Sequence, residues 1–343
     1  MIPSDRTFIV AEMSANHNHR FDVAVETIRA AARAGADAVK LQTYTPDTIT
    51  LDVRTPDFRI DGGLWDGRYL YDLYREAYTP WQWHEELFRI AREEGLVCFS
   101  TPFDPTAVDF LEELGNPICK IASFEITDIP LIEYAASKGK PMVMSTGIGT
   151  LAEIGLAVDA CRHAGNDDIT LLKCTSAYPA TIDAANLATM TDLRQRFGVK
   201  VGLSDHTVGS LCPVVAVSMG ATMIEKHFIL DHSIGGPDAA FSMDESEFAD
   251  MVRQVRQAEA AIGNVRYRES DTLVNGRQWC RSLYVTCDMQ PGDVITCDNV
   301  RSVRPGYGMP PRYLPAVIGC RVNRPIAAGS PLHPDCLDGF TAQ

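Results

Sequence analysis

Eight short apolar runs, each followed by a stretch with helical periodicity, constrain the fold of this chain more than any other feature. They span residues 8–13, 38–43, 97–103, 118–123, 142–147, 169–175, 200–205 and 223–228. Apolar strands that alternate with helices are typical of a parallel sheet covered by helices, and eight such units predict an α/β fold, a closed (β/α)8 TIM barrel. An open doubly wound sheet is the alternative. It is disfavoured because no Gly-x-Gly-x-x-Gly follows the first run.

The length of 343 residues exceeds the roughly 250 residues of such a barrel. We therefore expect a barrel domain over residues 1–263, a polar linker over 264–280 and a second domain over 281–343. The last segment has short strand-like runs broken by Pro and Gly, which predicts a small β-rich module. Within it, the similar phrases at 290–295 and 327–332 suggest a weak internal repeat.

Charge and hydropathy exclude several classes of partner. A formal net charge of −14 disfavours nucleic acid and anionic membrane surfaces, which need clustered Lys and Arg. We expect no signal peptide and no apolar run of the roughly 18 residues that a membrane-spanning helix requires. The ten cysteines are scattered and form no Cys-x-x-Cys, so they are expected to be reduced packing residues of a cytoplasmic protein.

Residues 45–80 form the one long excursion within the barrel repeat. It contains the sequence Gly-Gly-Leu-Trp-Asp at 62–66 and four tyrosines. Long loops between strand and helix commonly cover the substrate in barrel enzymes, so one interpretation is a lid. The other is a surface subdomain packed by its own aromatic side chains.

Two of the predicted strands lead directly into a histidine. His206 follows residues 201–205, His227 follows 224–226, and the intervening residues 211–219 read as a helix. Neighbouring parallel strands lie about 4.8 Å apart, and barrel active sites lie at the carboxyl ends of the strands. Two imidazoles in this arrangement can share a divalent metal. The alternative for each histidine is a hydrogen-bonded core residue at a strand end.

Two lysines lie inside apolar strands, where an unpaired charge is unfavourable. Lys40 and Lys120 therefore each need a negative partner. That partner is either an internal carboxylate, Glu12 or Glu125, or a bound phosphate or carboxylate. Potential phosphate donors lie at neighbouring strand ends: Thr101, Ser145, Thr146, Gly147 and Ser204. This combination of residues predicts a metal-assisted reaction on a phosphorylated substrate.

The first strand also ends in a polar run. Glu12 is a candidate for binding a sugar hydroxyl or for proton transfer, and Asn16 and His17 are candidates for lining the mouth of the barrel. The alternative is a capping loop before the first helix, which Asn18 would suit.

These motifs together resemble the sialic-acid synthase family over nearly the whole chain. The matching segments are 11–12 with 16–17, 40–42, 100–103, 120–123, 145–147, 202–206 and 225–227. The resemblance implies condensation of phosphoenolpyruvate with an amino sugar on a (β/α)8 barrel followed by an antifreeze-like (SAF) domain. Residues 14–17 and 62–66 are most similar to the pseudaminic acid branch, with the N-acetylneuraminate and legionaminic acid branches as alternatives.

The resemblance also implies roles for individual residues. His206 and His227 would bind a divalent metal (Mn²⁺, Mg²⁺ or Co²⁺), and with Glu12 they form the expected catalytic set. Phosphoenolpyruvate would be held by Lys40, Thr101, Lys120, Ser123, Ser145 and Ser204. The sugar would face Glu12, Tyr178 and Asp238. Arg304 would enter from the second subunit of a domain-swapped homodimer. Ser176 departs from the neuraminate pattern, which commonly has asparagine there, so a different sugar is expected.

We thus expect phosphoenolpyruvate and a 2,4-diacetamido-2,4,6-trideoxy hexose to give pseudaminic acid and phosphate. A metal-dependent aldolase or sugar isomerase could use the same histidines, but it would not need the phosphate-binding set. A non-enzymatic carbohydrate- or ice-binding protein, suggested by the C-terminal module alone, would leave the charges inside the barrel unexplained.

Overall fold

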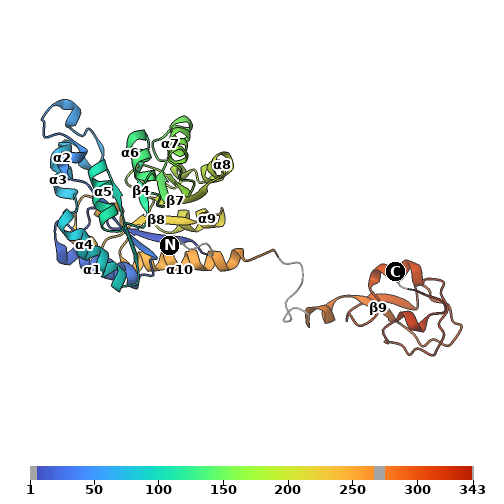
Figure 1. The fold of residues 1–343 in the computed structure, drawn as a ribbon. Coiled ribbons are helices and arrows are strands. Elements are labelled where there is room, and N and C mark those ends of the chain that lie inside the picture. Colours follow the sequence, from blue (N-terminus) through green and yellow to red (C-terminus); the bar gives the residue numbers. More distant parts are fainter. Residues whose placement is uncertain (1–5, 266–274, 342–343) are drawn as a thin grey trace. The chain divides into compact units, whose positions relative to one another are not determined.

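The computed structural model describes residues 6–265 and 275–341. The chain divides into two compact units, Met1–Gly263 and Asn264–Gln343 (Figure 1). Most of the predicted linker, residues 266–274, lies outside the described residues.

The first unit is a closed barrel of eight strands in sequential order, and the predicted (β/α)8 fold is confirmed. All neighbouring strands are parallel, and β8 closes on β1 through the pairs from Phe8↔Met223 to Glu12↔His227. The strands are β1 Phe8–Glu12, β2 Ala38–Thr43, β3 Val97–Pro102, β4 Cys119–Ile121, β5 Met142–Ser145, β6 Ile169–Cys174, β7 Lys200–Asp205 and β8 Met223–His227.

Eight helices surround the barrel (Figure 1): α1 Phe21–Arg33, α4 Trp81–Glu93, α5 Pro105–Glu113, α6 Ile129–Ala136, α7 Leu151–His163, α8 Ala188–Phe197, α9 Leu211–Ser218 and α10 Glu245–Ile262. Their inward faces follow helical spacing, as in α10, where Phe248, Met251 and Val255 are buried. Asp244 and Glu247 form a capping box that begins α10. Within the described ranges, no helix has both the length and the apolar character needed to cross a membrane.

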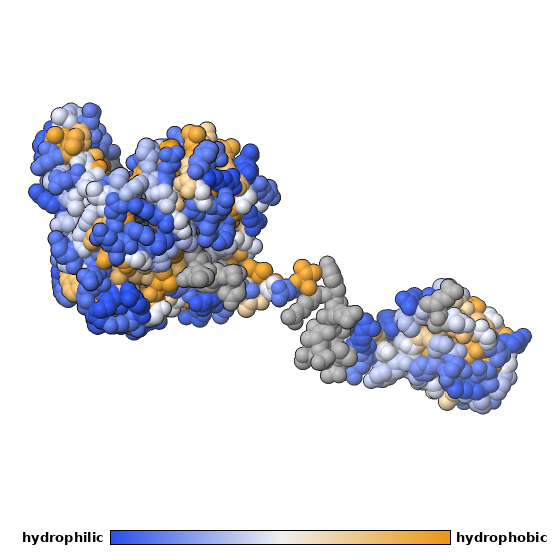
Figure 2. Space-filling view, viewed as in Figure 1, coloured by the Kyte–Doolittle hydropathy of each residue, from blue (hydrophilic) through white to orange (hydrophobic). Residues whose placement is uncertain are grey.

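Residues between β2 and α4 form the long excursion. It contains α2 Pro46–Ile49, the 3-10 turns η1 Pro56–Phe58 and η2 Gly63–Trp65, and α3 Leu70–Ala77. Figure 2 shows a mostly hydrophilic face with apolar groups on this excursion, which carries the exposed Leu51 and Leu64. Part of its base packs through aromatic contacts, since the ring of Tyr74 lies 5.7 Å from that of Tyr44.

The second unit has its own apolar core, centred on Leu283, Val300 and Leu332. Its regular sheet consists of β9 Ser282–Val285 paired antiparallel with β10 Val300–Val303. The strand-like phrases predicted at 290–295 and 327–332 do not form regular strands. They take part only in isolated bridges, Val294↔Arg321 and Tyr284↔Pro331. Each contains a glycine with positive φ, Gly292 at 93° and Gly329 at 80°, which breaks the extended conformation.

Candidate active site

The interior of the barrel changes from apolar to polar along the strands. The lower layer is a buried cluster made by Phe8, Val10, Ala38, Phe99, Ile118, Val143, Leu172 and Met223. Alternate residues of a strand share a face, so residues two positions after most of these form the next layer up. Those residues are Glu12, Lys40, Thr101, Lys120, Ser145, Cys174 and Glu225, joined by Ser204 after Gly202. The strand periodicity therefore places the polar set at the carboxyl end of the barrel.

Lys120 and Glu225 form the centre of this layer. Lys120 Nζ lies 3.0 Å from both carboxylate oxygens of Glu225 and 2.9 Å from Ser145 Oγ. Ser204 Oγ donates to Glu225 Oε1 at 3.1 Å. Burial alone would raise the pKa of Glu225, but Lys120 and Lys40 lower it to about 2, so the carboxylate is charged.

Lys40 joins Glu12 to the same network. Its Nζ lies 2.6 Å from Glu12 Oε2, 3.3 Å from Thr101 Oγ1 and 3.7 Å from Glu225 Oε1. Gln42 Nε2 donates to Glu12 Oε1 at 2.8 Å. Burial raises the pKa of Glu12, against the opposing effect of Lys40. Both lysines thus have carboxylate partners inside the barrel.

Of the two internal carboxylates considered from the sequence, only Glu12 pairs with a lysine. Lys40 pairs with Glu12, whereas Lys120 pairs with Glu225 and not with Glu125. Glu125 Oε2 is buried without a hydrogen-bond partner among the described residues. Burial raises the pKa of Glu125 to about 7.

The lysines leave the hydroxyl protons of Thr101 and Ser145 available. An ammonium group can only donate, so each of these hydroxyl oxygens accepts from its lysine. Neither hydroxyl proton has an acceptor in the described part of the chain. Ser145 and both lysines line one cavity of about 60 Å³. Thr101 is buried behind Lys40 and does not line it.

The predicted histidine pair is brought together. The register of β7 and β8 pairs Ser204 with Glu225 and Asp205 with Lys226, so His206 comes next to His227. Their ring centroids are 5.3 Å apart, and both residues line the same cavity.

The nitrogens of this pair that lack partners are suited to bind a metal ion. His206 Nδ1 lies 2.9 Å from the Thr175 carbonyl oxygen, which can only accept, so Nδ1 carries a proton and Nε2 is the nitrogen that the neutral ring would offer to a metal. His227 Nδ1 is buried and lacks a hydrogen-bond partner within the described residues. Burial, followed by His206 and the nearby lysines, holds the pKa of His227 well below its usual range. A neutral imidazole with an unpaired buried nitrogen fits a cation.

Tyr178 and Asp238 lie beside the histidines. The Tyr178 ring is 4.4 Å from that of His206 and 6.4 Å from that of His227, centroid to centroid. Asp238 is buried, accepts from Ser14 Oγ at 2.5 Å and has Oδ2 4.0 Å from His227 Nδ1. Burial raises the pKa of Asp238.

Ser123, Ser176 and Gly147 form a tight corner of the site. The two serine hydroxyl oxygens are 2.8 Å apart, and the Ile148 N–H donates to Ser123 Oγ at 3.2 Å. A Cβ on Gly147 would lie 2.1 Å from each hydroxyl oxygen, so a larger residue there would displace both serine side chains.

Several residues considered from the sequence do not line this cavity, Thr101 and Asp238 among them. Of the two candidates for the mouth, Asn16 donates to Phe228 O and Ser242 Oγ, and His17 Nε2 is hydrogen-bonded to Thr79 Oγ1. Arg304 belongs to the second unit, where it is exposed and has no hydrogen-bond or ion-pair partner among the described residues.

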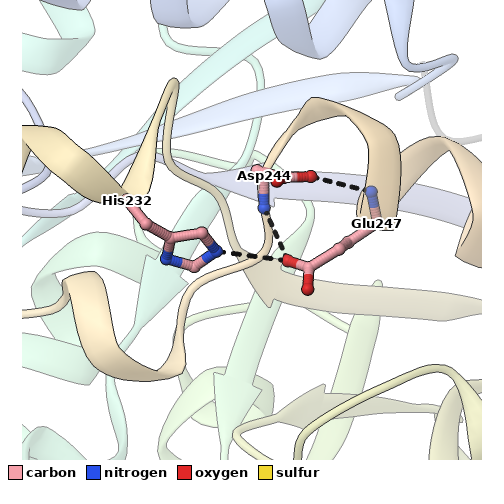
Figure 3. Close-up of side chains that lie close together, drawn as sticks. All are labelled: His232, Asp244 and Glu247. Carbon is pink, nitrogen blue, oxygen red and sulfur yellow. Dashed lines mark hydrogen bonds and ion pairs between the residues drawn. The ribbon is translucent and has the colours of Figure 1, made fainter.

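A second group of possible ligands lies outside the barrel interior. His232, Asp244 and Glu247 bring one ligand atom each within 4.8 Å of the others (Figure 3). Glu247 and Asp244 are occupied in the α10 capping box, at 2.9 and 3.0 Å. His232 Nε2 lies 3.3 Å from Glu247 Oε2. Internal bonding accounts for this cluster without a metal.

Comparison with known proteins agrees with this geometry. Residues 27–267 match the model of the NeuB family, and residues 281–338 match the model of the SAF domain. The predicted β-rich second domain is therefore an SAF domain.

Similar proteins cover almost the entire chain. A pseudaminic acid synthase from Helicobacter pylori is 48% identical over 96% of this chain and 97% of its own length. An N,N'-diacetyllegionaminic acid synthase from Legionella pneumophila is 37% identical over 95% of this chain and 93% of its own. The solved N-acetylneuraminic acid synthetase from Leptospira borgpetersenii, in complex with citrate, is 28% identical with a TM-score of 0.71, covering 79% of this chain and 90% of that one. The resemblance to sialic-acid synthases is confirmed, and the chain belongs to the NeuB family.

Proposed function

We propose that this protein condenses phosphoenolpyruvate with a 2,4-diacetamido-2,4,6-trideoxy hexose to give pseudaminic acid and phosphate. The observation that carries the proposal is the polar layer inside the barrel, where two lysines and several hydroxyls lie next to a histidine pair in one cavity. The choice of sugar rests on the higher identity to the pseudaminic acid synthase, 48%, than to the legionaminic acid synthase, 37%. The legionaminic or N-acetylneuraminic acid reaction is the second candidate.

The lysines and hydroxyls would hold phosphoenolpyruvate. Lys40 and Lys120 supply the two cations, and the O–H groups of Thr101 and Ser145 supply donors that have no other acceptor in the described chain. Charge-assisted hydrogen bonds to phosphate and carboxylate are about twice as strong as neutral ones. Ser123 and Ser204, which line the same cavity, complete the set.

Residues on the other side of the cavity would orient the sugar. Tyr178 offers a flat apolar ring, and Asp238 offers a carboxylate held by Ser14. Glu12 is the candidate to carry a proton, because its Oε1 and Oε2 reach into the cavity between Gln42 and Lys40.

His206 and His227 would hold a divalent metal, using His206 Nε2 and a free nitrogen of His227. Such a cation supplies Lewis-acid polarisation of the aldehyde oxygen. Asp238 Oδ2 lies 4.0 Å from His227 Nδ1, beyond hydrogen-bond distance, so it leaves that nitrogen free.

The bond changes balance without a further reactant. C3 of phosphoenolpyruvate bonds to the aldehyde carbon, and the aldehyde oxygen gains a proton to become a hydroxyl. Water adds at C2, and the C2–O bond to phosphate breaks to leave a 2-keto acid. The buried lysines and hydroxyls would stabilise the departing phosphate dianion.

The second unit would complete the site in a homodimer. Arg304 is exposed and lacks a partner among the described residues, so its guanidinium is free to donate to a substrate of a neighbouring subunit.

All ten cysteines lie in the described chain and none forms a disulfide, which suits a reducing cytoplasmic location.

A direct assay tests the proposal. The protein is incubated with phosphoenolpyruvate, a divalent metal and a panel of amino sugars, and phosphate release and product mass are measured. The expected result is one equivalent of phosphate per product, with the diacetamido trideoxy hexose preferred. An aldolase would form or cleave a C–C bond without releasing phosphate, and that outcome would reject the proposal.

A further inference from the structure

The excursion between β2 and α4 contains a small hairpin, which α3 follows. Arg59 bridges to Tyr69, the Ile60 N–H donates to the Arg68 carbonyl at 2.8 Å, and the Gly67 N–H donates back to the Ile60 carbonyl at 2.8 Å. Within the tip, the Gly62 N–H donates to Asp66 Oδ1 at 2.6 Å. These bonds fix η2, which carries Trp65, in one position.

The conformation of this tip depends on glycine. Gly62, Gly63 and Gly67 have φ of 82°, 74° and 79°, a region that residues with a Cβ rarely adopt. The three glycines therefore permit the backbone conformation that positions Trp65. The neighbouring side chain, Leu64, is 51% exposed to solvent.

Trp65 packs against the active-site tyrosine. The centroid of its ring lies 6.0 Å from that of Tyr178, with the planes tilted by 52°. Tyr178 in turn lies 4.4 Å from His206 and lines the cavity. Among the described residues no ring contact joins Trp65 to either histidine, so Tyr178 links the indole to the reacting end of the site.

The indole nitrogen of Trp65 lacks a partner. Nε1 is buried, yet it has no hydrogen bond to any described residue. Indole N–H can only donate, and burying a donor without an acceptor is unfavourable. Trp81 differs in this respect, since its Nε1 donates to the Tyr44 carbonyl at 3.1 Å. The acceptor that Trp65 requires is thus expected from a ligand.

We infer that Trp65 is a specificity-determining residue whose Nε1–H donates to the carbonyl oxygen of the C4 acetamido group of the sugar. This inference rests on the proposed function. An acetamido group combines one strong acceptor with a methyl group, which matches one free donor beside the apolar rings of Trp65 and Tyr178. The C4 group is selected because C1 must lie at the histidine pair, and Trp65 lies one aromatic ring further away.

The geometry also assigns the excursion a function. Of the two interpretations of residues 45–80, the contact of Trp65 with Tyr178 favours a lid over a subdomain packed only by its own aromatics. The lid would recognise the substrate by a single donor at its tip.

The test compares two sugars and three forms of the full-length enzyme. The sugars are the 2,4-diacetamido-2,4,6-trideoxy hexose and a matched 6-deoxy sugar with a hydroxyl at C4. The enzymes are the wild type, Trp65→Phe, which keeps a ring but removes the donor, and Leu64→Ala, a control on the exposed side of the same tip. The measurement is kcat/KM for each sugar, together with KM for phosphoenolpyruvate.

Trp65→Phe is expected to lower kcat/KM about 10-fold for the diacetamido sugar and less than about twofold for the C4-hydroxyl sugar. KM for phosphoenolpyruvate should be unchanged, and Leu64→Ala should behave like the wild type. An equal loss for both sugars, or no loss, would overturn the inference and leave Trp65 as a packing residue.

Two measurements keep the outcome decisive. If Trp65→Phe does not fold, Trp65→His, which has an N–H donor, is compared with Trp65→Leu, which has none. The measurement is kcat/KM for the diacetamido sugar divided by kcat/KM for the C4-hydroxyl sugar. Equal ratios for the two variants would overturn the inference. If the wild type releases phosphate with neither sugar nor with any other amino sugar, the proposed function itself fails, which is distinct from failure of the Trp65 assignment.

Discussion

Lys120 holds both carboxylate oxygens of Glu225 at 3.0 Å, although each residue comes from a different side of the barrel interior. The pair is buried, and Lys120 also donates to Ser145. A lysine anchored in this way is fixed in position before any ligand arrives, which reduces the ordering cost of binding.

Lys120→Met is therefore expected to raise KM for phosphoenolpyruvate by about 10-fold or more, because a hydrogen bond to a charged group contributes about 1.5–3 kcal/mol. KM for the sugar should change much less. Lys200→Met is the matched control, since Lys200 is half-exposed and pairs with Asp168 on the surface. An unchanged KM for phosphoenolpyruvate would reduce Lys120 to an internal ion-pair partner.

Measurement of bound metal in two variants distinguishes the histidine pair from the cluster in Figure 3 as the metal site. His227→Ala is expected to remove the bound divalent metal, measured by atomic spectroscopy after dialysis, with an unchanged circular dichroism spectrum. His232→Ala should retain the metal, because Asp244 and Glu247 already satisfy each other in the capping box. Loss of metal in His232→Ala alone would move the site to that cluster.

Glu125 predicts a pH dependence of stability. Its pKa is raised by burial from 4.5 to about 7, so the folded state holds a proton that the unfolded state releases. Stability from this group is greatest below the unfolded pKa and is lost as pH rises towards 7, by about 3 kcal/mol in all. Glu125→Gln should remove that slope in denaturant unfolding measured between pH 4.5 and 7.5. A wild-type slope equal to that of the variant would contradict the assignment.

The ion pair between Lys226 and Asp205 is a structural element next to the histidines. Lys226 Nζ lies 2.6 Å from Asp205 Oδ2, and both side chains are nearly inaccessible. Lys226→Met leaves a buried unpaired carboxylate, so the free energy of unfolding should fall by about 3–5 kcal/mol. Arg196→Met breaks an exposed pair with Asp192 and should cost less than about 1 kcal/mol. Equal losses in the free energy of unfolding for Lys226→Met and Arg196→Met would show that the buried pair stabilises the fold no more than the exposed one.

Subunit exchange tests the proposed role of Arg304. His206→Ala and Arg304→Ala proteins should each be nearly inactive, and mixing them should restore activity, since one site of a mixed dimer combines an intact barrel with an intact arginine. Subunit exchange is followed by energy transfer between labelled chains. Confirmed exchange without recovered activity would reject a shared site.

Local patterns predicted most of the barrel. The apolar runs that contain Lys40 and Lys120 lie at the expected strand positions, as do those that lead into His206 and His227. This is because strand periodicity and burial depend on neighbours along the chain. The partner of Lys120 was not predictable in the same way. Which carboxylate faces it across the barrel depends on the stagger of all eight strands, and this brings Glu225 rather than Glu125 into contact.

Contacts between distant segments explain the remaining differences. Asp238 meets Ser14 across 224 positions, and Trp65 meets Tyr178 through a hairpin whose shape depends on three glycines. In the second unit, turns with positive φ interrupt the extended phrases, so alternation alone overestimates its strands.

The polar layer draws its charges from the first and the last strands of the barrel. Glu12 belongs to β1, its partner Lys40 to β2, and the carboxylate that both lysines approach belongs to β8. Without β8 the barrel lacks Glu225, the carboxylate that Lys120 binds, and it also lacks the pairing with β1 that closes the sheet. The polar layer is therefore complete only when the last strand is in place.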